Sequence, residues 1–144
     1  MTATPEPTYD ELSEAERSWI EARLVAAADA GAVPSDPASV ARLFDAALAA
    51  VREGSAGPET GNAVVTQVGV LVGEHLCRAA GLRWAILTDE HGTDLCVRLP
   101  GSSLVLFPLS SAAKRWESGE TAWVEPFCAW AHERVTELTR SGTL

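Results

Sequence analysis

The sequence predicts an α+β fold in which a long core helix packs on a small antiparallel sheet. Apolar residues recur at helical spacing along most of the first 80 residues. Short runs rich in β-branched and aromatic residues, separated by turn residues, replace them over residues 84–107. A chain of 144 residues is long enough to bury one core without metal or disulfide staples. We therefore expect a disordered tail over residues 1–9 and a single domain over residues 10–144.

An N-terminal pair of helices is predicted by capping signals. Ser13 is followed three residues later by a glutamate, the spacing of a capping box, and this helix is expected to stop at Gly31. Asp36 and Pro37 suit the start of a second helix, whose one-sided apolar stripe ends at Gly54. Because only a short turn joins the two helices, we expect them to pack against each other in antiparallel orientation.

The core helix is predicted from Pro58 or Glu59 to Gly81. Its apolar stripe is wide enough for a helix that is buried on most sides. Gly69 and Gly73 interrupt the stripe, and a glycine inside a helix costs about 1 kcal/mol relative to alanine. We expect a strand or helix to approach closely at both glycines, and Gly81 to end the helix in a left-handed conformation.

A three-stranded antiparallel meander is predicted after the core helix. Its strands are expected at Trp84–Thr88, Leu95–Leu99 and Leu104–Phe107, with turns at residues 89–92 and 100–103. Such a small sheet is only marginally stable alone, so we expect the core helix to cover one face.

Two C-terminal helices complete the predicted fold. Ser110 or Ser111 is expected to cap a short helix that runs through Glu117 and ends at Gly119. The last helix is expected to follow residues 125–126.

The composition argues against several classes of partner. The net charge is -9 and the longest basic run is the pair Lys114 and Arg115, so we expect no binding of nucleic acid. The absence of a secretory signal and of a long apolar run predicts a cytoplasmic protein without membrane contact. The odd number and wide spacing of Cys77, Cys96 and Cys128 are typical of reduced thiols. No motif indicates a cofactor or a metal.

Two clusters of residues invite catalytic or metal-binding interpretations. His75 follows Glu74, but neighbours in a helix point about 100° apart, so the two cannot form a dyad by themselves. We expect His75 to be a core histidine whose ring nitrogens find hydrogen-bond partners. The acidic segment Asp89–Asp94 suggests a calcium loop, but the position that requires a glutamate is Pro100, so a solvated hairpin turn explains it better.

The segment Ser111–Lys114 matches the Ser-x-x-Lys pattern of penicillin-interacting enzymes. Their other two motifs are absent, so we interpret Ser111 as a helix cap.

The chain resembles a known family along Leu82–Val97, Phe107–Ser111 and Lys114–Glu120. It is similar to a bacterial family of uncharacterised small α+β proteins, domain of unknown function 3806, over about residues 61–138. The resemblance implies the fold and carries over no catalytic residue, because the family has no established activity. The positions that it singles out are Gly69, Gly73, Trp84, Asp89, Gly92, Phe107, Pro108, Arg115 and Glu117. Packing explains Arg115 and Glu117 least, and both could pair with groups outside their own helix.

The leading interpretation is a non-enzymatic protein-interaction module that binds a protein partner or self-associates as a homodimer. Its surface would be the open face or edge of the sheet, or the region of Trp116, Trp123 and Trp130, because tryptophan is enriched at interface hot spots. One alternative is a small enzyme or ligand-binding domain with a pocket between sheet and core helix. Another is an immunity or stress-response protein, which no residue specifies. The candidate binding residues are His75, Asp89, Arg115, Glu117, Trp116, Trp123 and Trp130.

Overall fold

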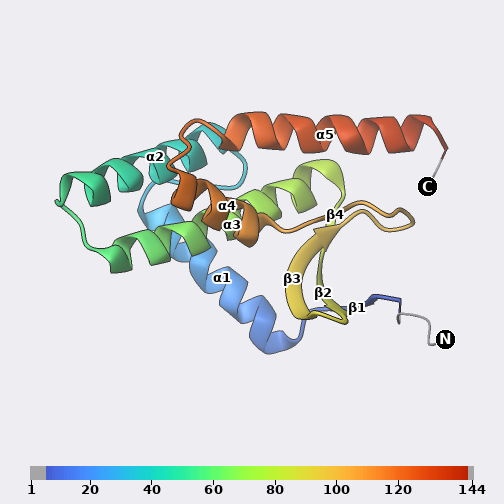
Figure 1. The fold of residues 1–144 in the computed structure, drawn as a ribbon. Helices are drawn as coiled ribbons and strands as arrows, with labels where there is room; N and C mark the ends of the chain where they lie inside the picture. Colours follow the sequence, from blue (N-terminus) through green and yellow to red (C-terminus); the bar gives the residue numbers. More distant parts are fainter. Residues whose placement is uncertain (1–5, 143–144) are drawn as a thin grey trace.

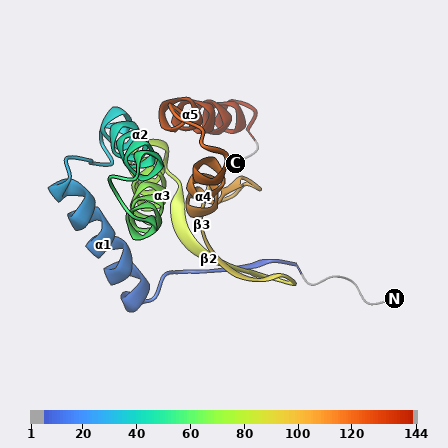
Figure 2. The same ribbon diagram turned by 60° about the vertical axis from the view of Figure 1, so that its left-hand side comes forward.

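The fold is built around one long helix, α3 (Pro58–Ala80), in a computed structural model that describes residues 6–142 (Figure 1). Helices pack around α3 on several sides, and an antiparallel sheet lies against part of it (Figures 1 and 2). The predicted α+β fold is therefore confirmed. The other helices are α1 (Glu14–Asp29), α2 (Pro37–Glu53), α4 (Pro108–Ser118) and α5 (Val124–Arg140).

Within residues 6–142 the sheet has four strands, one more than the sequence predicts. The strands β2 (Arg83–Asp89), β3 (Gly92–Arg98) and β4 (Val105–Leu106) form the expected antiparallel meander. The additional strand, β1 (Thr8–Asp10), pairs with the free edge of β2. The predicted disorder is thus wrong for residues 8 and 9, while residues 1–5 lie outside the described part of the chain. A three-residue strand has almost no sequence pattern of its own, since its partner supplies its hydrogen bonds.

Most helix ends lie where the sequence places them. Ser13 forms a capping box, Asp36 caps α2 with Pro37 in the first turn, and Gly54 and Gly81 end α2 and α3 in the left-handed conformation.

The predicted serine cap of α4 is wrong. The helix begins at Pro108, and Phe107 occupies the cap position without a side-chain hydrogen bond. A proline suits the first turn because the N–H group that it lacks would have no helical partner there. The last helix also begins earlier than expected, at Val124.

The two N-terminal helices do not form the antiparallel pair expected from their short connection. Both α1 and α2 make their principal helix contact with α3 (Figure 2). The sequence of α1 explains this arrangement, because Ile20 and Ala27 are its only fully buried residues and leave no second apolar face for α2.

The glycines of α3 allow close packing, as predicted. A Cβ atom on Gly69 would lie 2.6 Å from the Cα atom of Leu109 at the start of α4. A Cβ atom on Gly73 would overlap the ring of Trp84 in β2. The indole N–H of Trp84 donates to Glu74 Oε1 at 3.0 Å, which fixes the ring over the glycine. Helix and sheet are therefore in direct contact at this point.

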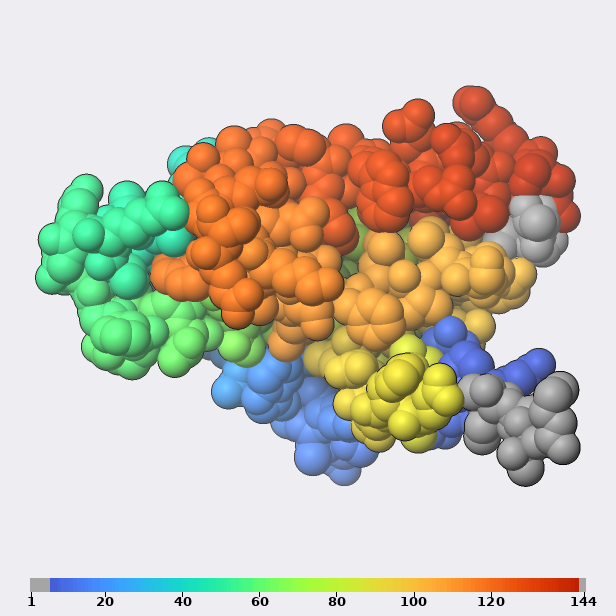
Figure 3. Space-filling model, viewed as in Figure 1, coloured from blue at the N-terminus to red at the C-terminus, as the bar shows by residue number. Residues whose placement is uncertain are grey.

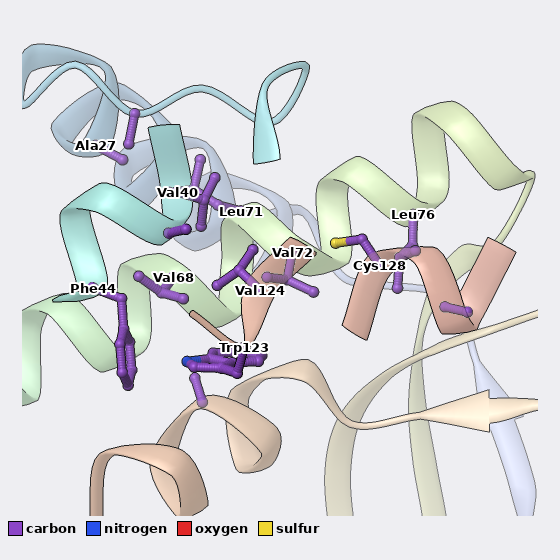
Figure 4. Packing of buried hydrophobic residues seen from close by; sticks show 14 of the residues in the cluster. Ala27, Val40, Phe44, Val68, Leu71, Val72, Leu76, Trp123, Val124 and Cys128 are labelled. Atoms are coloured by element: carbon purple, nitrogen blue, oxygen red, sulfur yellow. The ribbon is translucent and has the colours of Figure 1, made fainter. Parts of the chain in front are cut away.

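The main core lies where α2, α3 and α5 meet. Side chains from all three helices interdigitate there, and the most deeply buried of them are almost fully removed from solvent (Figure 4). Figure 4 labels the core residues that these three helices contribute, together with Trp123, which directly precedes α5. The helix residues are Val40, Phe44, Val68, Leu71, Val72, Leu76, Val124 and Cys128.

Candidate functional site

An aromatic hollow lies between the end of α4 and the start of α5, and we call it the tryptophan groove. Its volume is about 540 Å³. The elements that form it lie on the face shown in Figure 3, where α4 and the chain leading into α5 are orange. The groove is lined by Arg115, Glu120, Thr121, Ala122, Trp123, Pro126, Phe127 and Trp130.

The connection between α4 and α5 is held in place by α2. Gly119 ends α4 in the left-handed conformation, and Ala122 has a φ of 54°, which is unfavourable for a residue with a Cβ atom. The backbone N–H of Ala122 donates to both carboxylate oxygens of Asp45, at 3.2 and 3.3 Å. This charge-assisted hydrogen bond offsets the strain and sets the position at which α5 begins.

The aromatic rings of the groove run from the core to the surface. Trp123 is only 4% exposed and packs edge-on against Phe44 and Phe127, with ring centroids 5.5 and 5.8 Å away. Phe127 in turn lies 6.0 Å from Trp130, which is 47% exposed. Residues three and four apart are neighbours along a helix, so these rings form one ridge along α5.

One cation and one anion border the aromatic ridge. Arg115 Nε lies 3.3 Å from Glu120 Oε2, so Arg115 pairs outside its own helix, as predicted. Its guanidinium carbon lies 5.4 Å from the ring centroid of Trp123 and 5.7 Å from that of Phe127, within the range of cation–π attraction. A partly exposed ion pair of this kind contributes about 0–1 kcal/mol, so Arg115 can exchange Glu120 for another anion at little cost.

Three of the predicted binding residues meet in the groove, namely Arg115, Trp123 and Trp130. The ring of Trp116 instead covers Gly61 and packs edge-on against Phe44 at 5.5 Å. The side chain of Glu117 is exposed and makes no hydrogen bond or ion pair within residues 6–142.

His75 pairs with a second histidine that the sequence analysis did not single out. Its Nδ1 lies 2.8 Å from the carbonyl oxygen of Pro34, and its Nε2 lies 3.0 Å from Nε2 of His132 in α5. Because a carbonyl oxygen only accepts, His75 Nδ1 donates to it, and in the neutral pair His132 Nε2 donates to His75 Nε2. Within the described residues no carboxylate bonds to either ring.

The histidine pair predicts a pH-dependent stability. Burial, followed by the neighbouring charge of His75, lowers the pKa of His132. The unfolded chain therefore takes up the proton first, so this contribution to stability is complete above about pH 6.5 and is lost as the pH falls below it. We expect the melting temperature to decrease when the pH is lowered from about 7 to about 5.5. This decrease should be smaller in His132→Gln.

The exposed His91 of the hairpin provides the matched control. His91→Gln should keep the full pH dependence of the wild type. An equal slope in His132→Gln and wild type would contradict the assignment.

Asp89 lies at the tip of the β2–β3 hairpin. Its carboxylate accepts a hydrogen bond from the backbone N–H of His91 at 2.8 Å, which agrees with the predicted turn. The alternative of a pocket between sheet and core helix would use His75, Asp89 or Arg115, and these residues lie in three separate places. The structure does not bring them together.

The three cysteines of residues 6–142 lie wholly or partly buried. Burial raises the pKa of Cys77 to about 12 and that of Cys128 to about 11, which keeps both thiols protonated. All three cysteines are free. The described residues contain no group of three or more potential metal ligands, and none of their helices is long and apolar enough to cross a membrane.

The sequence analysis missed Phe127, Glu120 and His132 as neighbours of the candidate residues. The spacing of Trp123, Phe127 and Trp130 by four and three residues was the available signal for the groove. Nothing local connects His132 with His75, which lies 57 residues earlier in the chain.

Comparison with known proteins identifies the family. No characterised protein and no solved structure matches this chain. A family model described as Domain of unknown function (DUF3806) matches residues 44–127. The match begins inside α2, earlier than the expected limit near residue 61. It includes Arg115 and Trp123 of the tryptophan groove and ends before Trp130. Because the match covers more than half of the sequence, the chain belongs to the domain of unknown function family DUF3806.

Proposed function

We propose that the protein is a non-enzymatic protein-interaction module that binds a segment of a partner protein in the tryptophan groove. The supporting observation is the exposure of Trp130 beside an aromatic hollow of about 540 Å³. Tryptophan and arginine are the residues that most often dominate the energy of protein interfaces. Trp130 and Arg115 both line this hollow, so one ligand can contact both.

The lining of the groove favours an extended peptide with an apolar side chain. Aromatic-lined grooves recognise such segments by packing rings against side chains while the peptide backbone stays at the rim. Arg115 and Glu120 offer one donor group and one acceptor group for that backbone or for a charged side chain. The three free cysteines suit a reducing compartment, which supports action in the cytoplasm.

Selection from a displayed peptide library tests this proposal. We expect the wild-type protein to select peptides that bind Trp130→Ala at least about tenfold more weakly, because loss of a hot-spot tryptophan costs about 2 kcal/mol or more. Trp130 is half exposed, so the variant should keep its fold, as circular dichroism can verify. Trp19→Ala is the matched control, since Trp19 also lies beside an arginine, Arg23 at 4.4 Å, but on α1.

Light scattering over a range of concentrations tests self-association in the same groove. A dimer that dissociates in Trp130→Ala would identify a second copy as the occupant. A strict monomer that selects no peptide, or peptides that bind Trp130→Ala and wild type equally, would overturn the proposal.

A further inference from the structure

The face of the sheet that points away from α3 carries two arginines directly opposite each other. Arg83 of β2 and Arg98 of β3 are register partners, so their side chains leave the same face of the sheet. Ala85, Leu87 and Cys96 follow on that face and form a small apolar cluster that includes no helix residue. Like charges directly across a strand pair are destabilising. The arrangement therefore carries an energetic cost that the rest of the sheet does not explain.

Neither guanidinium has a charged partner in the described part of the chain. Within residues 6–142, no ion pair or side-chain hydrogen bond involves Arg83 or Arg98. The guanidinium of Arg98 lies 3.9 Å above the ring of Tyr9, and its Nε is buried without an acceptor. A buried charged donor that lacks an acceptor is costly, and nearly all such groups in folded proteins are satisfied. The site thus lacks a hydrogen-bond acceptor at Arg98.

A hollow of about 190 Å³ lies beside the two arginines. Tyr9, Trp84 and Pro100 give it apolar walls, and Asp10 and Glu11 also line it. Neither carboxylate is within 4.0 Å of a guanidinium nitrogen, but both would repel a second negative charge on a ligand. A ligand with one negative charge and an apolar body fits this environment better than a dianion.

We propose that Arg83 and Arg98 bind the carboxylate of a small organic acid in this hollow. The planar fork of arginine matches a carboxylate with two parallel hydrogen bonds. A bound carboxylate would accept hydrogen bonds from the Arg98 guanidinium, with a small shift of this side chain that brings the buried Nε–H within its reach, and would separate the two like charges with an anion. The hollow shares no residue with the tryptophan groove, so the two sites are independent.

Titration with benzoate, monitored by the NMR signals of the arginine Nε–H groups, tests the proposal. We expect a saturable shift of the Arg98 signal with benzoate and none with benzamide, which has the same ring without the charge. Arg98→Lys and Arg83→Lys should each weaken binding about tenfold or more, because lysine cannot form the two parallel hydrogen bonds of the arginine fork. Arg17→Lys is the control, since Arg17 is an exposed arginine of α1.

Several outcomes would overturn the proposal. These are an equal response to benzamide, an equal shift at Arg17, or no saturation up to about 50 mM benzoate. Tighter binding of inorganic phosphate than of benzoate would exclude the carboxylate as the preferred ligand. Arg83 is exposed, so Arg83→Lys decides the result if Arg98→Lys fails to fold.

Discussion

Replacement of Gly73 by leucine is expected to prevent folding. The position is buried in α3, and even a single Cβ atom there would overlap the ring of Trp84. The ring cannot move aside without breaking its hydrogen bond to Glu74 and displacing β2 from the helix. Adding one or two methylene groups to a packed core already costs about 1–3 kcal/mol, and leucine adds four carbon atoms. Circular dichroism and thermal denaturation of the purified variant would measure the loss.

Two further variants separate this steric effect from helix propensity. Gly73→Ala should lose stability although alanine favours a helix by about 1 kcal/mol over glycine. Ala79→Leu, at an exposed position of the same helix, should change stability by less than about 0.5 kcal/mol. A Gly73→Leu protein with a cooperative transition near that of the wild type would show that the ring does not fix the helix against the sheet.

Truncation of Phe44 to alanine should destabilise the fold by about 3–5 kcal/mol. The side chain is fully buried, and its ring packs edge-on against both Trp116 and Trp123 at 5.5 Å. The cavity left by the ring would therefore remove support from the buried end of the tryptophan groove. Chemical denaturation should show the loss of stability, and peptide binding in the groove should weaken as well.

The exposed Val25 of α1 is the matched control for Phe44. Val25→Ala should stay within about 0.5 kcal/mol of the wild type, since Val25 is 54% exposed. A loss of less than about 1 kcal/mol in Phe44→Ala would mean that the core can collapse around the missing ring.

The tryptophan groove depends on elements that are distant in sequence. Asp45 of α2 holds Ala122, Phe44 supports Trp123, and Arg115 of α4 lies over the rings of α5. Of these three contacts, only that of Arg115 joins elements that follow each other in the chain. A functional test of the groove is consequently also a test of how α2 positions the start of α5.

Local sequence determined most of the helices and the hairpin. Ser13, Asp36, Gly54 and Gly81 mark helix ends because capping and left-handed geometry act within a few residues. The glycines of α3 indicated a close contact because their cost to the helix has to be repaid by packing. The same local signals failed at α4, where a proline could begin the helix before either serine.

Tertiary structure alone decided the partners of these elements. The sequence by itself singled out Gly73, His75, Arg115 and Trp130, but it did not show which residues they contact. The structure pairs Gly73 with Trp84 and His75 with His132. It also pairs Arg115 with Glu120 and Trp130 with Phe127. The pairing of β1 with β2 joins segments that are far apart in the chain. The opposition of Arg83 and Arg98 depends on the register between β2 and β3. Propensities and caps are properties of a few consecutive residues, whereas long-range pairing is selected by the burial of the whole chain at once, and no short pattern records it.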